Sequence, residues 1–479
     1  MRVGFEMQPR VVLVPFPAQG HVTPMLHLAQ ALHAQGFLPM VASPDFIHRR
    51  IAAGRADPTD DHVGFASIPS GFGDAPRDFA AIDDAMENSM PGHLERLLKE
   101  LDGVVCVVVD LLASWAIPVV ARSGIPAAGF WPAMHATYRL ISAIPELIRK
   151  GFISECVIAG TPLYHHNHQD NQELMVRELQ LPGHVKLSTK DLPWLVGNSA
   201  SRKTRFAFWL RTLERAKALQ WLLINSFPGE GEDLDEHHPR SQPPERSPRT
   251  LHVGPLSANS MNSTERNEFD EEVPHVQFNP SMWEEDWSCV EWLGKQAHQS
   301  VVYVSFGSWV GPIGPEKIAE FALALEASKR PFLWVLKEDK AWRAGLPDGY
   351  LERVAGCGKV VGWAPQEEVL KHGAVGCYLT HCGWNSTVEA IQHGKRLLCY
   401  PISGDQFVNC AYIVRVWGIG IKLNGSSQSS MQDGIQKIMA GKEAMEIEAR
   451  VLNLKKQISR NSRALANLQC FIDEVRKIS

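Results

Sequence analysis

The sequence predicts an α/β fold built from two doubly wound domains. The chain has 479 residues, which is more than one hydrophobic core usually serves. In both halves, short runs of apolar residues alternate with stretches of helical periodicity, which is the pattern of parallel sheets covered by helices. A polar, acidic segment separates the halves and has the composition of a linker. We therefore expect an N-terminal domain over residues 1–255, a linker over 256–286 and a C-terminal domain over 287–462.

Composition argues against several classes of protein. The net charge of −5 lacks the basic excess that nucleic-acid binding normally shows, so no nucleic-acid partner is expected. The nine cysteines form no CxxC pair and are odd in number, which favours a reducing compartment. The first ten residues contain no apolar segment of secretory length, and no later apolar run is long enough to span a membrane. We expect a soluble cytoplasmic protein.

A histidine follows the first predicted strand. The apolar run Val11–Val14 is typical of a buried strand, and Thr23 and Pro24 suit the N-cap and first position of a helix. These signals place His21 in the loop between them. Open parallel sheets bind ligands beyond the carboxyl ends of their strands, so His21 is a candidate functional residue.

A second candidate lies at the end of another predicted strand. Val104–Val109 is almost wholly apolar, as a strand buried on both faces would be, and it ends at Asp110. The residues alone leave two interpretations of this carboxylate open, a helix cap and a functional group. Further along, Trp221–Asn225 is expected to be the last strand of the first sheet.

The segment 380–387 has the pattern of a strand end, a glycine turn and a helix start. Unpaired amides in the first turn of a helix bind anions, and Gly383 allows close approach to the main chain. His381 and Ser386 add side-chain donors. A capped turn of an ordinary α/β protein would also account for Asn385 and Ser386, so the segment alone is weak evidence.

Neighbouring residues supply the groups that a nucleotide sugar needs. Trp363 offers an aromatic plane for a base, and Glu389 offers a carboxylate for the hydroxyls of a ribose. Asp405 and Gln406 offer a carboxylate and an amide for the hydroxyls of a hexose. The helix-start amides suit a pyrophosphate.

The stretch from Trp363 to Gln406 closely resembles the signature box of the plant secondary-product glycosyltransferases, the family 1 enzymes that use UDP-sugars. It matches in its Trp-Ala-Pro-Gln opening, its His-Cys-Gly-Trp-Asn-Ser-Thr core, its Glu and its closing Asp-Gln. The resemblance implies the GT-B architecture, two Rossmann-like domains that face a central cleft. It also implies that the last helical segment, residues 463–479, packs back on the N-terminal, acceptor-binding domain.

The resemblance further implies a role for each matching residue. Trp363 is expected to stack on uracil, and Gln366 and Glu389 to hold the ribose. The phosphates are expected at His381 and its neighbours and the sugar at Trp384, Asp405 and Gln406, with Gln406 favouring UDP-glucose as the donor. The full set expected to bind the UDP-sugar is Ser308, Trp363, Ala364, Gln366, His381, Gly383, Trp384, Asn385, Ser386, Glu389, Asp405 and Gln406.

The same resemblance assigns the catalytic pair. Imidazole has the basicity to deprotonate a hydroxyl near neutral pH, so His21 is expected to be the general base. Asp110 occupies the place of the aspartate that orients this histidine. No metal and no permanently bound cofactor is expected, because His381, Ser308 and helix amides would stabilise the departing pyrophosphate. The sequence Asp233-Leu234-Asp235 has the shape of a metal-binding motif but lies in an acidic run typical of a solvated surface.

The sequence thus predicts a monomeric, inverting glucosyltransferase that uses UDP-glucose. Its acceptor would be a hydroxyl of a small lipophilic molecule, such as a flavonoid, phenolic, terpenoid or hormone, and its product a β-O-glucoside. The alternatives are C-glycosylation or another UDP-sugar on the same fold. A protein that binds a nucleotide sugar or small molecule without transferring anything is a third possibility.

Overall fold

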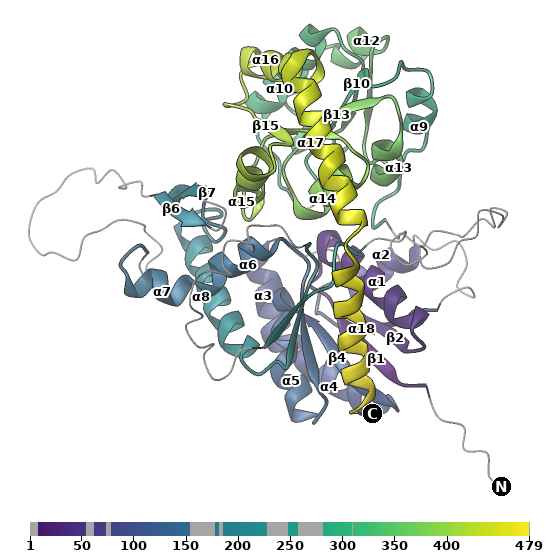
Figure 1. Cartoon of the computed structure of the whole chain (residues 1–479), viewed down its shortest axis with the longest axis vertical. Coiled ribbons are helices and arrows are strands. Elements are labelled where there is room, and N and C mark those ends of the chain that lie inside the picture. The colour runs from purple at the N-terminus through teal and green to yellow at the C-terminus, as the bar shows by residue number, and fades with distance from the viewer. Residues whose placement is uncertain are drawn as a thin grey trace, which may run out of the picture.

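The structure of the protein is a computed structural model. It describes residues 8–53, 62–72, 78–153, 178–181, 185–227, 248–256, 281–308 and 310–478. Among these residues, no helix combines the length and the apolarity needed to cross a lipid bilayer. The described chain forms two lobes, one above the other in Figure 1, each built around one parallel sheet.

The first sheet has seven parallel strands in the order β3-β2-β1-β4-β5-β8-β9. Their bounds are β1 Arg10–Val14, β2 Leu38–Pro44, β3 Gly64–Ile68, β4 Val104–Asp110, β5 Ala127–Trp131, β8 Trp221–Ile224 and β9 Arg249–His252. The expectation that the 221–225 strand ends this sheet is wrong, because β9 pairs alongside β8. Strand β9 lies at the edge of the sheet, and only two of its four residues are even partly shielded from solvent. The apolar run that marks a central strand is therefore missing from its sequence.

The second sheet has six parallel strands in the order β12-β11-β10-β13-β14-β15. Their bounds are β10 Val301–Ser305, β11 Phe332–Val335, β12 Gly358–Val361, β13 Val375–Thr380, β14 Arg396–Cys399 and β15 Gly420–Lys422. Every residue of β10 and β13 is buried, because helices cover both faces of the sheet. A separate antiparallel pair, β6 Glu178–Leu181 and β7 Val185–Ser188, lies beside the first lobe.

Helices follow the strands in both lobes. Those of the first lobe are α1 Gln19–Ala34, α2 Asp45–Ala53, α3 Phe79–Asp84, α4 Pro91–Glu100, α5 Ala116–Arg122, α6 His135–Ser142, α7 Ile144–Arg149 and α8 Ser199–Ala216. The rest of the chain contributes α9 Ser288–Leu293, α10 Pro315–Ser328, α11 Lys340–Arg343, α12 Tyr350–Val354, α13 Gln366–Lys371, α14 Trp384–Gln392, α15 Gln406–Ala411, α16 Gln428–Met439, α17 Gly441–Ser459 and α18 Ser462–Arg476.

In each sheet, the strand order has a point at which the chain, after adding strands on one side of the first strand, continues on its other side. In the first sheet β1 lies between β2 and β4, and in the second β10 lies between β11 and β13. Ligands of open α/β sheets bind outside the carboxyl ends of the strands at such points. His21 lies beyond the end of β1, and Asp110 is the last residue of β4. Ser308 lies beyond the end of β10, and His381 directly follows β13. The topology therefore places all four residues at the crevice of their own sheet.

Helix α1 begins earlier than the sequence predicts. It starts at Gln19 after an extended Ala18, so Pro24 lies inside the helix and His21 lies in its first turn rather than in a loop. A proline inside a helix leaves the carbonyl four residues before it without its helical donor. Here that carbonyl belongs to Gly20, and it accepts a hydrogen bond of 2.8 Å from Asn385 Nδ2 of the second lobe. The cost of the proline is thereby offset by a contact between the lobes.

The last helix, α18, returns to the first lobe and packs beside its sheet (Figure 1). Phe471 is 1% exposed and packs edge-to-face on Trp221, with ring centroids 5.6 Å apart. Glu474 pairs with Arg249, and Asn467 Nδ2 donates to the His252 carbonyl over 2.9 Å. The C-terminal helix therefore completes the outer end of the first sheet.

Replacing Phe471 with alanine should destabilise the first lobe by about 3 to 5 kcal/mol, because the change opens a cavity against β8. Calorimetry of the purified protein would record this as a lowered thermal transition. Leu465→Ala is the matched control, since Leu465 lies on the same helix and is 40% exposed. Equal effects of the two substitutions would contradict the docking of α18.

Candidate active site

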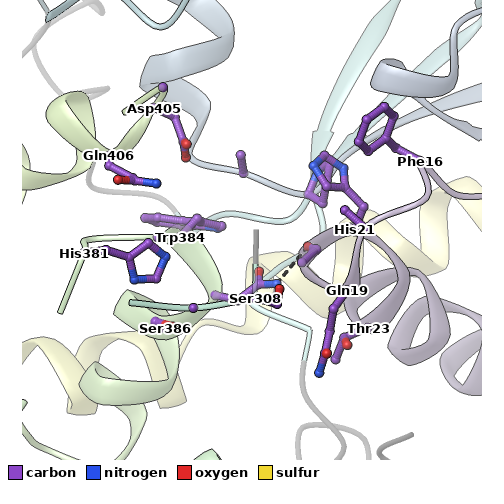
Figure 2. A pocket seen from close by; sticks show the side chains of 18 of the residues that line it. Phe16, Gln19, His21, Thr23, Ser308, His381, Trp384, Ser386, Asp405 and Gln406 are labelled. Carbon is purple, nitrogen blue, oxygen red and sulfur yellow. Dashed lines mark hydrogen bonds between the residues drawn. The ribbon is translucent and has the colours of Figure 1, made fainter. Parts of the chain in front are cut away.

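A cavity of about 350 Å³ lies between the two lobes. Figure 2 shows residues of α1 and the preceding loop on one side and residues of the second lobe on the other. All of the predicted site residues except Asp110 line this cavity. Asp110 is fully buried behind His21. The folded chain thus gathers residues that lie nearly 400 positions apart in the sequence around one space.

His21 and Asp110 form a directly hydrogen-bonded pair. His21 Nδ1 lies 2.7 Å from Asp110 Oδ2, and the imidazole is 21% exposed while the carboxylate is wholly buried. The backbone N–H of Leu112 donates to Asp110 Oδ1 over 2.9 Å, and that of Phe16 donates to Oδ2 over 3.4 Å. These three donors satisfy a carboxylate that would otherwise be costly to bury.

The geometry of the pair sets the tautomer of His21. A carboxylate can only accept, so Nδ1 carries the proton and Nε2 keeps its lone pair. The Phe16 ring packs edge-on against the imidazole at a centroid distance of 5.1 Å and limits its rotation. The arrangement is that of a general base oriented by a buried carboxylate.

His381 lies across the cavity and is held between two glycines. A side chain at Gly307 or Gly383 would collide with the His381 ring, and Gly307 also has a φ of 73° that disfavours other residues. Burial lowers the pKa of His381 to about 4. The imidazole is therefore neutral at pH 7 and can present an N–H donor to a bound anion without carrying a charge.

Gln366 and Glu389 form a linked polar group at one end of the cavity. The hydroxyls of the buried Tyr303 and Tyr378 donate to Gln366 Oε1 over 3.2 and 3.1 Å. Gln366 Nε2 then donates to Glu389 Oε2 over 2.7 Å and to Ser386 Oγ over 3.0 Å. Both groups of the Gln366 amide are thus engaged within the protein, whereas the parts of this polar group that face the cavity include the Glu389 carboxylate.

Trp363 lies next to this polar group and is half-buried. Its indole N–H donates to Ser281 Oγ over 3.1 Å, and its ring lies 5.5 Å from that of Trp283 at an angle of 33°. Ala364 is buried beside it. Our sequence reasoning missed Trp283 as a partner of Trp363, because the two indoles lie 80 positions apart and share no motif.

Asp405 and Gln406 are oriented by neighbouring polar groups. The backbone amides of Ile402 and Ser403 donate to Gln406 Oε1 over 2.9 and 3.0 Å, so its NH₂ group remains for a ligand. Asn409 Nδ2 donates to Asp405 Oδ2 over 2.9 Å. Burial raises the pKa of Asp405, and the Asn409 hydrogen bond opposes that shift.

Two consecutive residues of α14 join the lobes. Trp384 donates its indole N–H to the Asn225 carbonyl over 2.8 Å and stacks on Phe227, and Asn385 donates to Gly20. The side-chain donors of both residues are therefore engaged between the lobes. The sugar and phosphate contacts expected of them are left to the Trp384 ring and to the backbone amides at the start of α14.

Ser308 follows β10 and lines the cavity. Its carbonyl accepts a hydrogen bond of 2.8 Å from Lys337 Nζ, which also donates to the Val310 carbonyl over 3.2 Å. Burial lowers the pKa of Lys337 to about 8. This lysine, which our sequence reasoning missed, holds the turn that carries Gly307 and Ser308.

Three cysteine thiols form a buried cluster that includes Cys382, the residue directly after His381. The sulfur atoms of Cys382, Cys399 and Cys410 are all buried and within 4.8 Å of one another, which makes them the one group of potential metal ligands found among the described residues. The Asp233-Leu234-Asp235 motif lies outside the described residues.

The far wall of the cavity is predominantly apolar. Its side chains come from the first lobe and include Phe16, Phe79, Leu112, Trp131, Ile141, Pro193, Val196, Phe208 and Trp209. One charged residue, Arg205 of α8, lies among them, and the sequence analysis did not single it out. The cavity thus has a polar half in the second lobe and an apolar half that faces His21.

Two parallel α/β sheets with a shared cavity at their carboxyl ends form the GT-B architecture, which the sequence predicts and solved structures confirm. Anthocyanidin 3-O-glucosyltransferase in complex with UDP superposes with a TM-score of 0.77 at 22% identity, over 99% of this chain and 100% of that one. An indoxyl-glucosylating UDP-glucosyltransferase of Polygonum tinctorium gives 0.76 at 26% identity, over 98% of each chain.

Sequence comparison gives the family. A model described as UDP-glucoronosyl and UDP-glucosyl transferase matches residues 273–454. UDP-glycosyltransferase 82A1 of Arabidopsis thaliana is 46% identical over 97% of each chain, and (R)-mandelonitrile beta-glucosyltransferase of Prunus dulcis is 30% identical over 95% of this chain and 93% of its own. The chain therefore belongs to the plant family 1 UDP-glycosyltransferases, enzymes that use a UDP-sugar as donor.

The affinity for UDP should rise with pH through Glu389. Burial raises the pKa of this carboxyl to about 7, so the group is largely neutral at pH 6 and ionised at pH 8. An ionised carboxylate is the stronger acceptor for ribose hydroxyls, and we expect Glu389→Gln to weaken UDP binding about tenfold at pH 8 and much less at pH 6.

Calorimetric titration of wild type and variant at both pH values checks this prediction. The ratio of the two dissociation constants is the quantity to compare, because the ionisation of UDP itself affects both proteins equally. A ratio that does not change with pH would contradict the role of Glu389.

Proposed function

We propose that this enzyme transfers glucose from UDP-glucose to a hydroxyl group of a small lipophilic acceptor, inverting the anomeric carbon to give a β-O-glucoside. The hydrogen-bonded pair of His21 and Asp110 carries the proposal. It places an oriented base beside the apolar half of the cavity, where a lipophilic alcohol or phenol would bind.

The proposed reaction is a single displacement. His21 Nε2 takes the proton of the acceptor hydroxyl as its oxygen attacks the anomeric carbon of glucose. The bond from that carbon to the β-phosphate oxygen breaks on the opposite side, and the electron pair leaves with UDP. Asp110 stabilises the imidazolium that forms, in the way that a buried carboxylate supports a triad histidine.

The donor is proposed to lie along the second lobe. Trp363 would stack on uracil, Glu389 would accept from the ribose, and the α14 amides, Ser308 and neutral His381 would hold the pyrophosphate. Asp405 and the free NH₂ group of Gln406 would hold the hydroxyls of glucose.

We further propose that residues 1–255 with the terminal segment 463–479 form the acceptor domain and that 287–462 form the donor domain, joined by 256–286. The separate sheets and the contacts of α18 with β8 and β9 support this division. A monomeric, cytoplasmic enzyme remains the prediction from sequence.

Replacing His21 with alanine should reduce kcat for glucosylation by about 10² to 10⁴-fold, because it removes the base, while the affinity for UDP stays within about twofold. The assay is mass spectrometry of a mixed panel of phenolic and terpenoid alcohols incubated with UDP-glucose. His93→Ala is the control substitution, because His93 is a partly exposed histidine of α4 that does not line the cavity.

Three results would count against the proposal. Undiminished turnover of the His21→Ala variant removes the catalytic base. A C-linked product, which resists acid hydrolysis, or a clear preference for another UDP-sugar corrects the reaction type. Binding of UDP-glucose without transfer to any panel member favours a binding protein instead.

Transfer should also survive treatment with EDTA. The proposed stabilisation of the leaving pyrophosphate comes from neutral donors and the helix dipole of α14, so no divalent ion is needed for the step. Measuring the initial rate with and without chelator, and again after Mg²⁺ is restored, tests this point. A rate that collapses with EDTA and returns with Mg²⁺ would assign the step to a metal ion.

A further inference from the structure

One charged side chain stands in the apolar half of the cavity. Arg205 lies on α8, where residues three and four positions apart share a face, and it therefore lies on the side of the helix that carries Phe208 and Trp209. Its guanidinium sits over the Phe79 ring at 4.2 Å from the centroid. That ring packs in turn on Phe208, with centroids 5.1 Å apart.

Arg205 differs from Arg211 and Arg215 of the same helix in having no anionic partner, whereas Arg202 near the start of α8 donates to the Gly197 carbonyl over 2.9 Å. Arg211 donates to both oxygens of Asp83, and Arg215 pairs with both oxygens of Glu87. No carboxylate among the described residues lies within ion-pair distance of Arg205, and its Nε is buried without a hydrogen-bond acceptor.

Holding the Arg205 guanidinium in partly apolar surroundings without an anionic partner costs free energy. Burial lowers the pKa of Arg205, yet a guanidinium stays protonated at any physiological pH, so the positive charge persists in apolar surroundings. The contact with Phe79 offsets part of the cost, but an aromatic face does not provide the oxygen acceptor that the buried Nε–H lacks. The guanidinium of Arg205 is therefore suited to bind a planar anion, and no carboxylate of the described residues pairs with it.

A second unsatisfied group lies on the same apolar wall. Thr137 of α6 lines the cavity at 1% exposure, and its hydroxyl has no hydrogen-bond partner among the described residues. Trp131 beside it does not need a ligand, because its indole N–H donates to the Met134 carbonyl over 2.9 Å. The Gln19 side-chain oxygen of α1 also lines the cavity without a partner, so among the described residues of this half Arg205, Thr137 and Gln19 all offer polar atoms to a ligand.

We infer that the natural acceptor is a hydroxylated carboxylic acid with an apolar, flat body, whose carboxylate binds Arg205 while its hydroxyl faces His21. This inference rests on the proposed glucosyl transfer and narrows its acceptor. The aromatic wall fits a ring system, and the fork of the guanidinium matches a carboxylate in two parallel hydrogen bonds. Arg205 is in this role a specificity-determining residue that does not touch the reacting atoms.

The test compares hydroxyaryl acids with their own methyl esters, for example 4-hydroxycinnamic acid with methyl 4-hydroxycinnamate. For at least one pair, the wild-type enzyme should have a kcat/KM for the acid about tenfold or more above that for its ester. The difference should come from a lower KM for the acid. In Arg205→Met, which keeps the apolar length of the side chain, this preference should disappear while transfer to the ester persists. Arg205→Lys should restore part of it.

Lys203→Met is the matched control, because it removes one positive charge from the exposed side of α8. The control should keep the preference for the acid. Tryptophan fluorescence, with Trp131 and Trp209 in the wall, measures acid binding independently of turnover. Alkaline hydrolysis distinguishes an O-glucoside, which is stable, from a glucose ester, which would place the carboxylate at His21 instead and overturn the assignment.

The outcomes separate this inference from the proposed function. Transfer that depends on His21 but shows no preference for the acid in any pair refutes the role of Arg205 and leaves the glucosyltransferase standing. Acid binding that depends on Arg205, without transfer of glucose to any acceptor, supports the acid site and refutes the transfer.

Discussion

The buried carboxylate of Asp110 is the group on which the arrangement around His21 depends. It ends the apolar strand β4, and its three hydrogen bonds reach the loop after β1, helix α1 and the turn that follows β4. An unpaired carboxylate at zero exposure would cost several kcal/mol, so these donors are a condition of folding as well as of function. The orientation of His21 follows from the same requirement.

A similar constraint acts at Pro24, where a backbone carbonyl needs a hydrogen-bond donor and finds it in the other lobe. The proline leaves the Gly20 carbonyl without a helical donor, and the Asn385 amide of the opposite lobe provides one. Gly20 directly precedes His21, and Asn385 lies in the first turn of α14. This hydrogen bond between the lobes therefore also helps to set the separation between His21 and the helix start proposed to hold the phosphates.

The donor half of the site was largely predictable from sequence because one continuous stretch supplies most of it. A strand, a tight turn and a helix start dictate where His381, Gly383 and Ser386 lie once β13 is buried. Side-chain hydrogen bonding was not predictable in the same way. Gln366 accepts from Tyr303 and donates to Glu389, and the Trp384 indole donates to Asn225. These partners come close only in the folded chain.

The acceptor half could not be predicted because its wall is assembled from many separate elements. Helix α8 contains several basic residues, and sequence alone gives no reason to separate Arg205 from Arg211 or Arg215. Folding separates them, since Asp83 and Glu87 come within reach of the last two only. Local sequence pattern and burial usually agree in a folded protein, and the half-buried Arg205, which has no anionic partner among the described residues, is an exception. Such an exception at the wall of a ligand cavity is evidence about the ligand, because only a bound anion would complete the pairing that α8 makes elsewhere.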